Sequence, residues 1–352
     1  MLENNHNEKK VIQRLIKWYS NNKRTLPWRK KNSKNLPNPY YVFVSEFMLQ
    51  QTTVNAVIPR FLEFIDKWPN LKKFSSINEN EITKFWSGLG YYARSKNLLK
   101  SAKIIQKNFK GKIPSNYEDL INLPGVGDYT AKAIIGIAYN KPVMPVDANI
   151  ERILARLNGF KNPLKKIKLE LINVSNEYVS KKLASNLIQA FMDYGSIICT
   201  PRNPNCNNCV IKFNCISFKK NLQNIIPVKI KPKKQKRKKY SRAYIFFNEY
   251  DEILVRRRPS KGMLASMLEV PNDNWTLDKK KLFQDKIVNK IKKKIKHKGL
   301  IEYSFSHFDL QIEVFFANVK KNNFSKYKWI KKNNFKKSGL PTVMKKIVEF
   351  AV

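Results

Sequence analysis

Residues 123–134 read LPGVGDYTAKAI, and this stretch decides the fold of the first part of the chain. Two glycines separated by one valine precede apolar residues at helical spacing, which predicts a tight hairpin that opens a helix. Gly125 and Gly127 lack a Cβ, so their backbone can adopt φ > 0 and approach another chain closely. Amide groups at such a helix start suit a phosphate oxygen. The simpler interpretation is a turn between two core helices.

The segments on either side of the hairpin favour a contact with DNA. SNYEDLIN (115–122) is helical in character, and TAKAIIGIAY (130–139) continues the apolar periodicity after the glycines. Together they resemble a helix-hairpin-helix DNA-binding element over residues 115–139, in which Gly125 and Gly127 contact DNA. Asp128 adds a negative charge beside the expected phosphate, and we expect it to weaken or redirect that contact.

The chain is strongly basic, because 69 Lys and Arg against 26 Asp and Glu give a formal net charge of +43 over 352 residues. Such a charge predicts a polyanionic partner, although a general bias toward Lys, Asn and Ile would also produce it. The N-terminus lacks the apolar core of a signal peptide, and no run reaches the ~18 apolar residues of a membrane span. We therefore expect a soluble cytoplasmic protein, associated with the nucleoid and not with membranes.

Periodicity divides the chain into three parts. Residues 1–225 show helical spacing of apolar residues, residues 226–241 form a basic linker that includes KIKPKKQKRKK, and residues 242–352 alternate β-branched and aromatic residues. In the last part we expect a hairpin turning at 248–251, a helix over 277–298 and two strands within 301–319. The predicted fold is multi-domain, with an all-α domain followed by an α+β domain.

All four cysteines fall within seventeen residues, in the spacing C-x6-C-x2-C-x5-C. They are Cys199, Cys206, Cys209 and Cys215. Disulfides are disfavoured in a cytosolic chain, so this clustering predicts metal ligation. Zinc accepts four thiolates and so does a [4Fe-4S] cluster, and the spacing by itself does not choose between them.

The LPGVG hairpin, the VDAN segment at 146–149 and the cysteine spacing together resemble the endonuclease III superfamily of DNA glycosylases, over residues 11–215. The resemblance implies that the four cysteines of the 199–215 loop hold one [4Fe-4S] cluster. Its role would be structural and would position DNA, since hydrolysis requires no redox chemistry.

Breaking the bond between a base and its sugar needs one acid to protonate the base and one carboxylate to stabilise the sugar cation. Glu46 lies on an apolar stripe with Val42, Leu49 and Thr53, where burial would raise its pKa as an acid requires. Asp147 precedes an expected helix. The simpler interpretations are a partly solvated helix residue for Glu46 and an N-cap for Asp147.

SEFMLQQT (45–52) resembles the SEVMLQQT segment of MutY-type adenine DNA glycosylases. The resemblance implies that Glu46 protonates adenine, that Asp147 stabilises the sugar cation and that Asn149 orients the aspartate and the attacking water. Ala148 stands where the family pattern has glycine, which leaves both polar neighbours in place but questions the local backbone conformation.

Tyr129 occupies the position at which bifunctional members of the superfamily carry a lysine that forms a Schiff base with the sugar. A phenol cannot form an imine, so Tyr129 resembles the MutY-type pattern, in which this residue hydrogen-bonds near the catalytic carboxylates. A tyrosine packed in the core is the alternative. Lys132 lies one helical turn further on and could supply only weak lyase activity.

A base-flipping enzyme must also fill the gap left in the duplex and hold the extruded base. Gln51 and Tyr91, from LQQT and GLGYYARSKNL, match family positions that wedge into DNA. Around the adenine pocket the resemblance implies Arg24, Trp28, Arg29 and Gln189. The chain is longer than family members between Arg29 and Pro39, which weakens the pocket assignment there.

The C-terminal part resembles the Nudix-like domain of MutY-type enzymes in RRRPSKGMLASMLEVP, although Ser266 and Leu268 replace the usual glycine and aromatic residue. No REUxEExGU motif follows, so magnesium pyrophosphatase chemistry is not expected. The triplet Phe305, Ser306 and His307 matches the place where the family reads 8-oxoguanine. Ser306 and His307 would hydrogen-bond the lesion while Phe305 fixes the turn, and a plain strand-end turn is the alternative.

These features predict a monofunctional adenine DNA glycosylase of base excision repair. Its expected partner is double-stranded DNA containing adenine opposite 8-oxoguanine or guanine, and we expect it to act as a monomer. Two other functions stay open: an endonuclease III-like glycosylase and lyase acting on oxidised pyrimidines, and a non-catalytic iron-sulfur protein that binds DNA.

Overall fold

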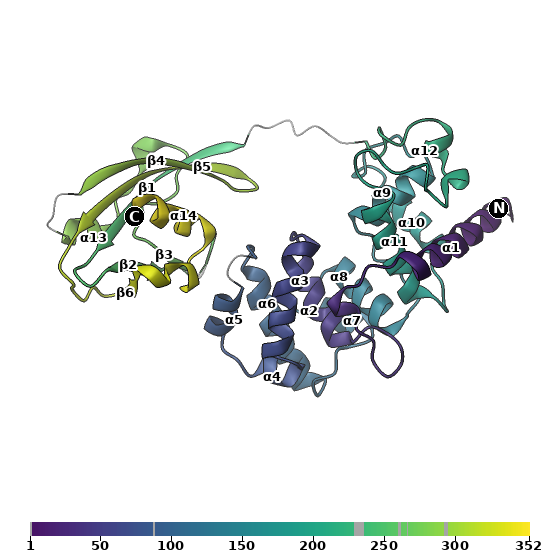
Figure 1. The fold of residues 1–352 in the computed structure, drawn as a ribbon, viewed down its shortest axis with the longest axis horizontal. Coiled ribbons are helices and arrows are strands. Elements are labelled where there is room, and N and C mark those ends of the chain that lie inside the picture. Colours follow the sequence, from purple (N-terminus) through teal and green to yellow (C-terminus); the bar gives the residue numbers. More distant parts are fainter. Residues whose placement is uncertain (1, 87–88, 229–235, 260–261, 266, 292–294) are drawn as a thin grey trace. The chain divides into compact units, whose positions relative to one another are not determined.

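The computed structural model describes residues 2–86, 89–228, 236–259, 262–265, 267–291 and 295–352 (Figure 1). Two compact units make up the chain. Unit 1 contains residues 1–76 and 97–231, and unit 2 contains residues 77–96 and 232–352. Residues 77–96 therefore group with the second unit, whereas the sequence placed them in the helical domain.

Unit 1 is helical, as predicted. Its elements are α1 (Leu2–Asn22), η1 (Pro27–Arg29), α2 (Pro39–Leu49), α3 (Val54–Lys67), α4 (Leu71–Ser75), most of α6 (Ala93–Asn108), α7 (Tyr117–Ile121), α8 (Asp128–Ala133), η2 (Ile134–Ala138), α9 (Ala148–Leu157), α10 (Lys168–Glu177), α11 (Ala184–Ile197), η3 (Lys212–Asn214) and α12 (Ile216–Lys219). Short polar side chains start several of them, since Asn38, Asn70 and Asn116 each accept an amide hydrogen bond in the first turn.

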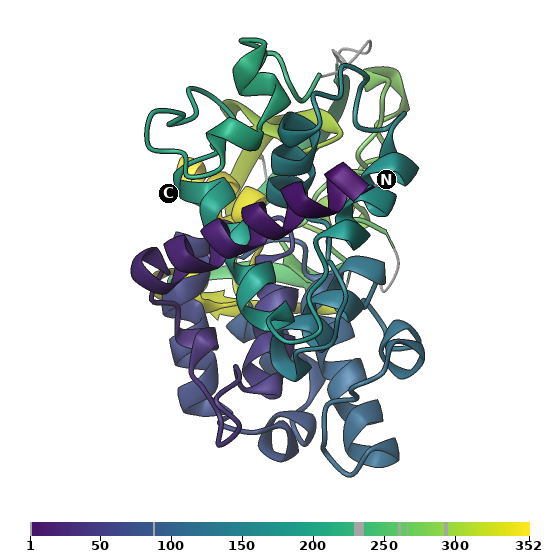
Figure 2. The same cartoon turned by 90° about the vertical axis from the view of Figure 1, so that its right-hand side faces the viewer.

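Two helices organise unit 1. α11 packs against α1, α9 and η2, and in Figure 2 α1 crosses the front of this unit. α2 packs against α3, α8 and η2. Its sequence PYYVFVSEFML is apolar on every side, which is the pattern of a helix buried all round. A carboxylate in this helix is therefore removed from water by the fold itself.

Unit 2 combines α5 (Glu79–Phe85) and the start of α6 with a mixed sheet. The other elements are β1 (Arg237–Phe247), β2 (Glu252–Arg257), β3 (Leu268–Glu269), η4 (Lys279–Lys281), α13 (Lys286–Lys290), β4 (Lys296–Ser304), β5 (Phe308–Asn318), β6 (Tyr327–Lys331), η5 (Lys332–Lys337) and α14 (Thr342–Ala351). The strand order is β3-β2-β1-β5-β4 with β6 also paired to β2. β1 and β5 run parallel, and the other named pairs are antiparallel.

The sheet of unit 2 buries both faces. Ala243 and Ile245 of β1 point into a core that α14 covers, whereas Tyr244 and Phe246 point into a second core that contains residues of α13. This alternation is the period of two that a β-strand imposes. The predicted α+β fold and the predicted hairpin at 248–251 are confirmed.

Two predictions for this part of the chain were wrong in detail. Among the described residues of 277–298, only Lys286–Lys290 forms an α-helix, and Lys296 already begins β4, which pairs with β5. The basic linker is shorter than expected, since residues 237–241 belong to β1 and pair with β5. Residues 229–235 of that linker and Ser266 lie outside the described residues.

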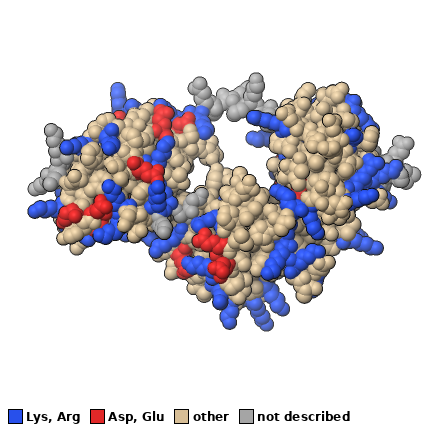
Figure 3. All heavy atoms as spheres, in the orientation of Figure 1, with Lys and Arg blue, Asp and Glu red and all other residues tan. Residues whose placement is uncertain are grey.

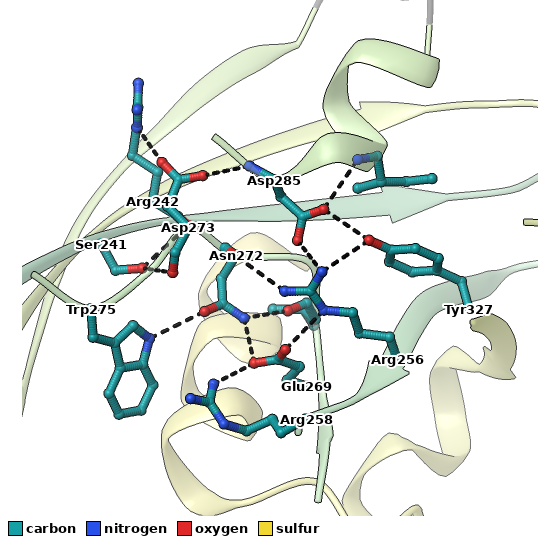
Figure 4. Close-up of polar contacts among 12 residues, drawn as sticks. Ser241, Arg242, Arg256, Arg258, Glu269, Asn272, Asp273, Trp275, Asp285 and Tyr327 are labelled. Carbon is teal, nitrogen blue, oxygen red and sulfur yellow. Dashed lines mark hydrogen bonds and ion pairs between the residues drawn. The ribbon is translucent and has the colours of Figure 1, made fainter. Parts of the chain in front are cut away.

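A network of buried ion pairs joins β2 to the loops that follow β3 (Figure 4). Arg256 Nε donates to Glu269 Oε1 at 2.8 Å, and Arg256 Nη1 lies 2.6 Å from Asp285 Oδ2. Arg258 pairs with the same Glu269, whose side chain is 2% exposed. Buried carboxylates need such partners, so the network fixes the position of these loops.

No helix in the described part of the chain combines the length and apolar character needed to cross a bilayer.

Candidate functional site

Glu46 lies in α2 with 7% of its surface exposed. Burial, and to a smaller extent the negative charge of Asp147, raise the pKa of this carboxyl to about 8, although a hydrogen bond with Tyr129 acts in the opposite direction. A carboxyl with this pKa holds its proton at neutral pH, which is the state of a general acid. The predicted stripe is shorter than expected, because α2 ends at Leu49 and Thr53 is the residue before α3.

Asp147 is the N-cap of α9. Its Oδ1 accepts hydrogen bonds from the amides of Asn149 at 2.9 Å and Ile150 at 2.8 Å, and its Oδ2 accepts one from Asn149 Nδ2 at 2.9 Å. Burial raises the pKa of Asp147, and these hydrogen bonds act in the opposite direction. Ala148 is the first residue of α9, a helical position that alanine adopts readily. The expected N-cap role is present, and it leaves the carboxylate held in one orientation.

Tyr129 comes from α8 and is half-buried. Burial and the charges of Glu46 and Asp147 raise the pKa of this phenol well above its usual value, so its hydroxyl stays neutral. The structure thus brings together three side chains from α2, α8 and α9 that the sequence singled out separately. The group contains one protonated carboxyl, one carboxylate held by amide donors and one neutral phenol.

Arg152 links Asn149 to the cysteine segment. Its Nη2 donates to Asn149 Oδ1 at 2.9 Å and to the Gly195 carbonyl at 2.6 Å, and its Nε donates to the Cys199 carbonyl at 2.7 Å. Gly195 is needed here, because a Cβ at this position would lie 2.6 Å from Asn149 Cβ. α11 and α9 therefore approach closely, and Asn149 is fixed from both sides.

The hairpin glycines differ in their surroundings. Gly125 has φ +80°, and a Cβ there would lie 2.8 Å from Asn97 Cβ. Gly127 has φ −100°, and a Cβ there would meet no atom within 4 Å. The fold therefore requires a glycine at position 125. It does not require one at position 127, where the space around the residue is open. The charge of Asp128 is engaged, because it pairs with Lys132 at 2.9 Å and accepts a hydrogen bond from Tyr117 at 3.0 Å.

A pocket of about 640 Å³ is bordered by Arg24, Arg29 and Gln189, three of the four residues expected around adenine. Both arginines are held by Asp193, whose side chain is 0% exposed, with Arg24 Nε at 2.6 Å and Arg29 Nη1 at 2.7 Å from its carboxylate. Trp28, the fourth residue, is buried and packs against Phe61. Neither proposed catalytic carboxylate is among the residues that line this pocket.

The two expected wedge residues share an uncommon backbone conformation. Gln51 has φ 56° and Tyr91 has φ 46°, a left-handed region that costs energy for a residue other than glycine. Both side chains are exposed. Within unit 2, the hydroxyl of Tyr91 lies 2.7 Å from Ser306 Oγ.

The expected lesion-reading triplet forms the turn between β4 and β5. Phe305 stacks on Phe308 with ring centroids 4.9 Å apart and contacts Trp275 at 5.4 Å. Ser306 and His307 are exposed at the tip. The aromatic contacts hold the turn, so the hydroxyl of Ser306, which bonds Tyr91, and the side chain of His307 lie at the surface of unit 2.

The four cysteines are unbridged and half-buried, and they line one narrow pocket together with Arg156 and Tyr194. Arg156 Nη1 donates to Cys199 Sγ at 3.2 Å. In the described ranges, no three Cys, His, Asp or Glu side chains are already arranged around a single metal ion. Four thiols around one pocket with a nearby guanidinium are nevertheless a donor set that fits an iron-sulfur cluster.

Three charged residues near the site were not identified from the sequence, namely Asp193, Arg152 and Arg156. Each is a charged residue within an otherwise apolar helical stripe, LIQAFMDYG in α11 and NIERILARL in α9. That position inside a buried stripe is the signal that could have identified them, since a buried charge requires a partner.

Lys and Arg side chains are spread widely over the face drawn in Figure 3, between uncharged residues, whereas Asp and Glu form a few small groups there. The high positive charge is therefore displayed on the surface, where it favours a polyanion.

Known proteins match both parts of the chain. The sequence profile described as "HhH-GPD superfamily base excision DNA repair protein" matches residues 44–175, and that of the NUDIX domain matches residues 242–350. An adenine DNA glycosylase of Buchnera aphidicola subsp. Schizaphis graminum is 33% identical over 347 residues, covering 96% of this chain and 97% of that relative. This chain belongs to the adenine DNA glycosylase family.

More distant relatives agree. The human adenine DNA glycosylase is 28% identical, over 95% of this chain and 72% of its own length. A solved thermostable thymine-DNA glycosylase is 26% identical with a TM-score of 0.56, covering 62% of this chain and 99% of its own. An endonuclease III in complex with DNA shares the fold of the 62% of this chain that it covers, with a TM-score of 0.52, 19% identity and coverage of 98% of its own chain.

Proposed function

We propose that this adenine DNA glycosylase removes adenine paired with 8-oxoguanine or guanine by hydrolysis, without cutting the strand. Membership of the family makes the chain a base-excision-repair enzyme that releases adenine from DNA. The observation that carries the mechanism is the buried pair of carboxyl groups, in which Glu46 has a pKa of about 8 beside Asp147 with its amide donors. These two groups divide the roles of acid and cation stabiliser.

The reaction proceeds through protonation of the base. Glu46 gives its proton to the flipped adenine, the bond between sugar and base breaks, and the bonding electron pair leaves with adenine. Asp147 stabilises the positive sugar by its negative charge, and Asn149 keeps that carboxylate in place through the 2.9 Å hydrogen bond. Water then adds to the sugar carbon and returns a proton to the ionised Glu46, which restores the starting state.

Tyr129 separates this reaction from that of a lyase. Its neutral phenol hydrogen-bonds Glu46 and cannot form an imine with the sugar. The amine of Lys132 is paired with Asp128 on the exposed side of the hairpin. Both features support hydrolysis alone and disfavour the endonuclease III-like alternative.

The DNA contacts follow from the exposed features of the two units. Gly127 lets a phosphate approach the amides after the hairpin, since nothing in the protein itself occupies that space. Gln51 and Tyr91 enter the duplex, and this function explains why their left-handed backbone conformation is retained. Arg24, Arg29 and Gln189 border the space for adenine, and Ser306 and His307 contact 8-oxoguanine. The protein acts as a monomer on duplex DNA.

The cysteine loop holds a [4Fe-4S] cluster. When bound, the cluster ties the 199–215 loop together and contributes no step to the hydrolysis. Arg156 supports it by donating to Cys199 Sγ and to the carbonyl of Thr200 at 2.8 Å. Purified protein should contain four iron and four acid-labile sulfide atoms per chain, and stoichiometric zinc without sulfide would contradict the assignment.

A single-turnover assay tests the function. A duplex with adenine opposite 8-oxoguanine should lose adenine, and strand breaks should appear only after alkali. Borohydride should trap no covalent adduct between protein and DNA. Breaks without alkali at the rate of base loss would favour the lyase, and binding without release of adenine would favour a non-catalytic protein.

A further inference from the structure

Unit 2 contains a hollow of about 590 Å³ beside the turn that carries Ser306 and His307. His307 and Phe308 form one side of it, Trp275 forms another, and three cations border it. These cations are Arg237, Lys239 and Lys281. The hollow thus combines positive charge with aromatic walls next to the expected lesion-reading turn.

Four consecutive cations, Lys236 directly before β1 and the first three residues of β1, divide between the two faces of the sheet. Lys238 Nζ lies 2.9 Å from Glu302 Oε1 and Lys236 Nζ lies 3.9 Å from Asp309 Oδ1, so these two are engaged within the sheet. Successive side chains of a strand point to opposite faces, and Arg237 and Lys239 accordingly border the hollow on the other side. The pairing of β1 with β5 therefore turns a basic run into two sets of cations with different surroundings.

The cations that border the hollow differ from Lys236 and Lys238 in their partners. Among the residues that the structure describes, Arg237, Lys239 and Lys281 take part in no ion pair; the Lys239 amine lies 4.6 Å from the centre of the Phe308 ring. The hollow is lined by one acid, Asp278, whose Oδ1 accepts the amide of Lys280 at 2.9 Å as a helix cap. Three cations facing one concave surface repel each other, so an anion that fills the hollow is favoured.

The walls of the hollow are fixed. Trp275 Nε1 donates to Asn272 Oδ1 at 3.1 Å, and Asn272 Nδ2 donates to Glu269 at 2.7 Å (Figure 4). Glu269 is held in turn by the arginines of the buried network, and the Trp275 ring contacts Phe305. The hollow and the lesion-reading turn therefore share one rigid support. A group bound in the hollow would have a fixed position relative to the turn.

We propose that this hollow binds one or two phosphate groups of the DNA strand that carries 8-oxoguanine, immediately beside the lesion. The assignment rests on the proposed function, because it takes Ser306 and His307 as readers of that strand. Phosphate contacts set the register of a protein on DNA and base contacts supply specificity. The strand would be held in register by Arg237, Lys239 and Lys281. His307 belongs to the lesion-reading turn and also lines the hollow, and it would face the base.

The test compares two double variants of the full chain with equal charge. R237Q/K239Q removes two cations from the hollow, and K236Q/K238Q removes the two that are already paired. Affinity is measured for a duplex with 8-oxoguanine opposite a non-hydrolysable 2′-fluoro adenosine, between 50 and 200 mM salt. Each lost phosphate contact reduces the salt slope by about 0.9, so over this fourfold range the wild type should lose about twelvefold more affinity than R237Q/K239Q. K236Q/K238Q should keep the wild-type slope.

A second measurement locates the phosphates. Uncharged methylphosphonates replace the phosphates of each strand one at a time. Wild-type affinity should fall at one or two positions next to 8-oxoguanine, and R237Q/K239Q should be insensitive there. Equal salt slopes for the two variants, or sensitivity confined to the adenine strand or absent altogether, would overturn the proposal. Release of adenine is scored separately, so failure of the glycosylase function with the interference pattern intact is distinguishable from failure of the phosphate site.

Discussion

Replacing Tyr129 by phenylalanine should move the alkaline limit of base release to higher pH. The pKa of Glu46 is about 8, against an ordinary value of 4.5. At pH 7 about nine in ten molecules then carry the proton, whereas an ordinary glutamate would carry it in about 0.3%. The protonated fraction is therefore about 300-fold larger than for an ordinary glutamate. This ratio corresponds to about 3.4 kcal/mol in the free energy of having the acid protonated at pH 7.

The hydrogen bond with Tyr129 lowers the pKa of Glu46, because it stabilises the carboxylate. Hydrogen bonds to charged groups contribute about 1.5–3 kcal/mol, so its loss should raise the midpoint by about one to two pH units. Wild-type activity should fall about tenfold per pH unit above pH 8, and activity of Tyr129→Phe should begin to fall at about pH 9–10. The rate below pH 7 can change as well, so the position of the limit is the readout.

Single-turnover rates at enzyme concentrations well below saturation report the groups of the free protein. They would be measured from pH 5 to 10 with adenine opposite 8-oxoguanine and alkali after the quench. Tyr139→Phe is the control, because the hydroxyl of Tyr139 donates to the Ile113 carbonyl and not to Glu46. A wild-type limit below pH 6, or a limit that stays or moves down in Tyr129→Phe, would refute this account of Glu46.

Four further predictions test other parts of the site. Glu46→Gln should abolish base release. It should also raise the melting temperature at pH 8, because the native state of the wild type loses stability as pH rises from 4.5 toward 8 and glutamine does not titrate. The difference in melting temperature should vanish near pH 4.5 in thermal denaturation. Asp147→Asn should reduce single-turnover release at least about a hundredfold with little change in DNA affinity, and full activity would remove Asp147 from its role. Gly125→Ala should lower the free energy of unfolding by about 1–3 kcal/mol because of its left-handed φ and the 2.8 Å contact. Gly127→Ala should leave that free energy within about 0.5 kcal/mol but weaken DNA binding, and unchanged affinity in a titration would argue against a phosphate at the hairpin.

The sequence by itself determined the elements whose pattern is local. Helical spacing marked unit 1, the two glycines marked the hairpin, and alternation around 248–251 marked the first two strands of the sheet. Glu46 was conspicuous because a carboxyl interrupted an apolar run, and the cysteines were conspicuous because they clustered. Each of these signals depends on residues close together in the chain, so no knowledge of packing was needed.

The tertiary structure decided which of these residues act together. Glu46 and Asp147 are far apart in the chain, and the fold buries Glu46 close enough to Asp147 for that charge to raise its pKa. Asp193 forms ion pairs with Arg24 and Arg29, and no spacing pattern in the sequence predicts these partners.

Strand pairing explains the predictions that were wrong. The KRKK segment at 236–239 has the composition of a linker, and only pairing with β5 makes its last three residues a strand and sorts the cations by face. The Lys-rich segment 277–298 has helical spacing, yet its end extends as β4 because hydrogen bonds to β5 outweigh a weak local preference. Periodicity depends on residues that are neighbours in the sequence, so it can be recognised without a structure. Desolvation, ion pairing and strand register depend on segments that come into contact only in the folded chain.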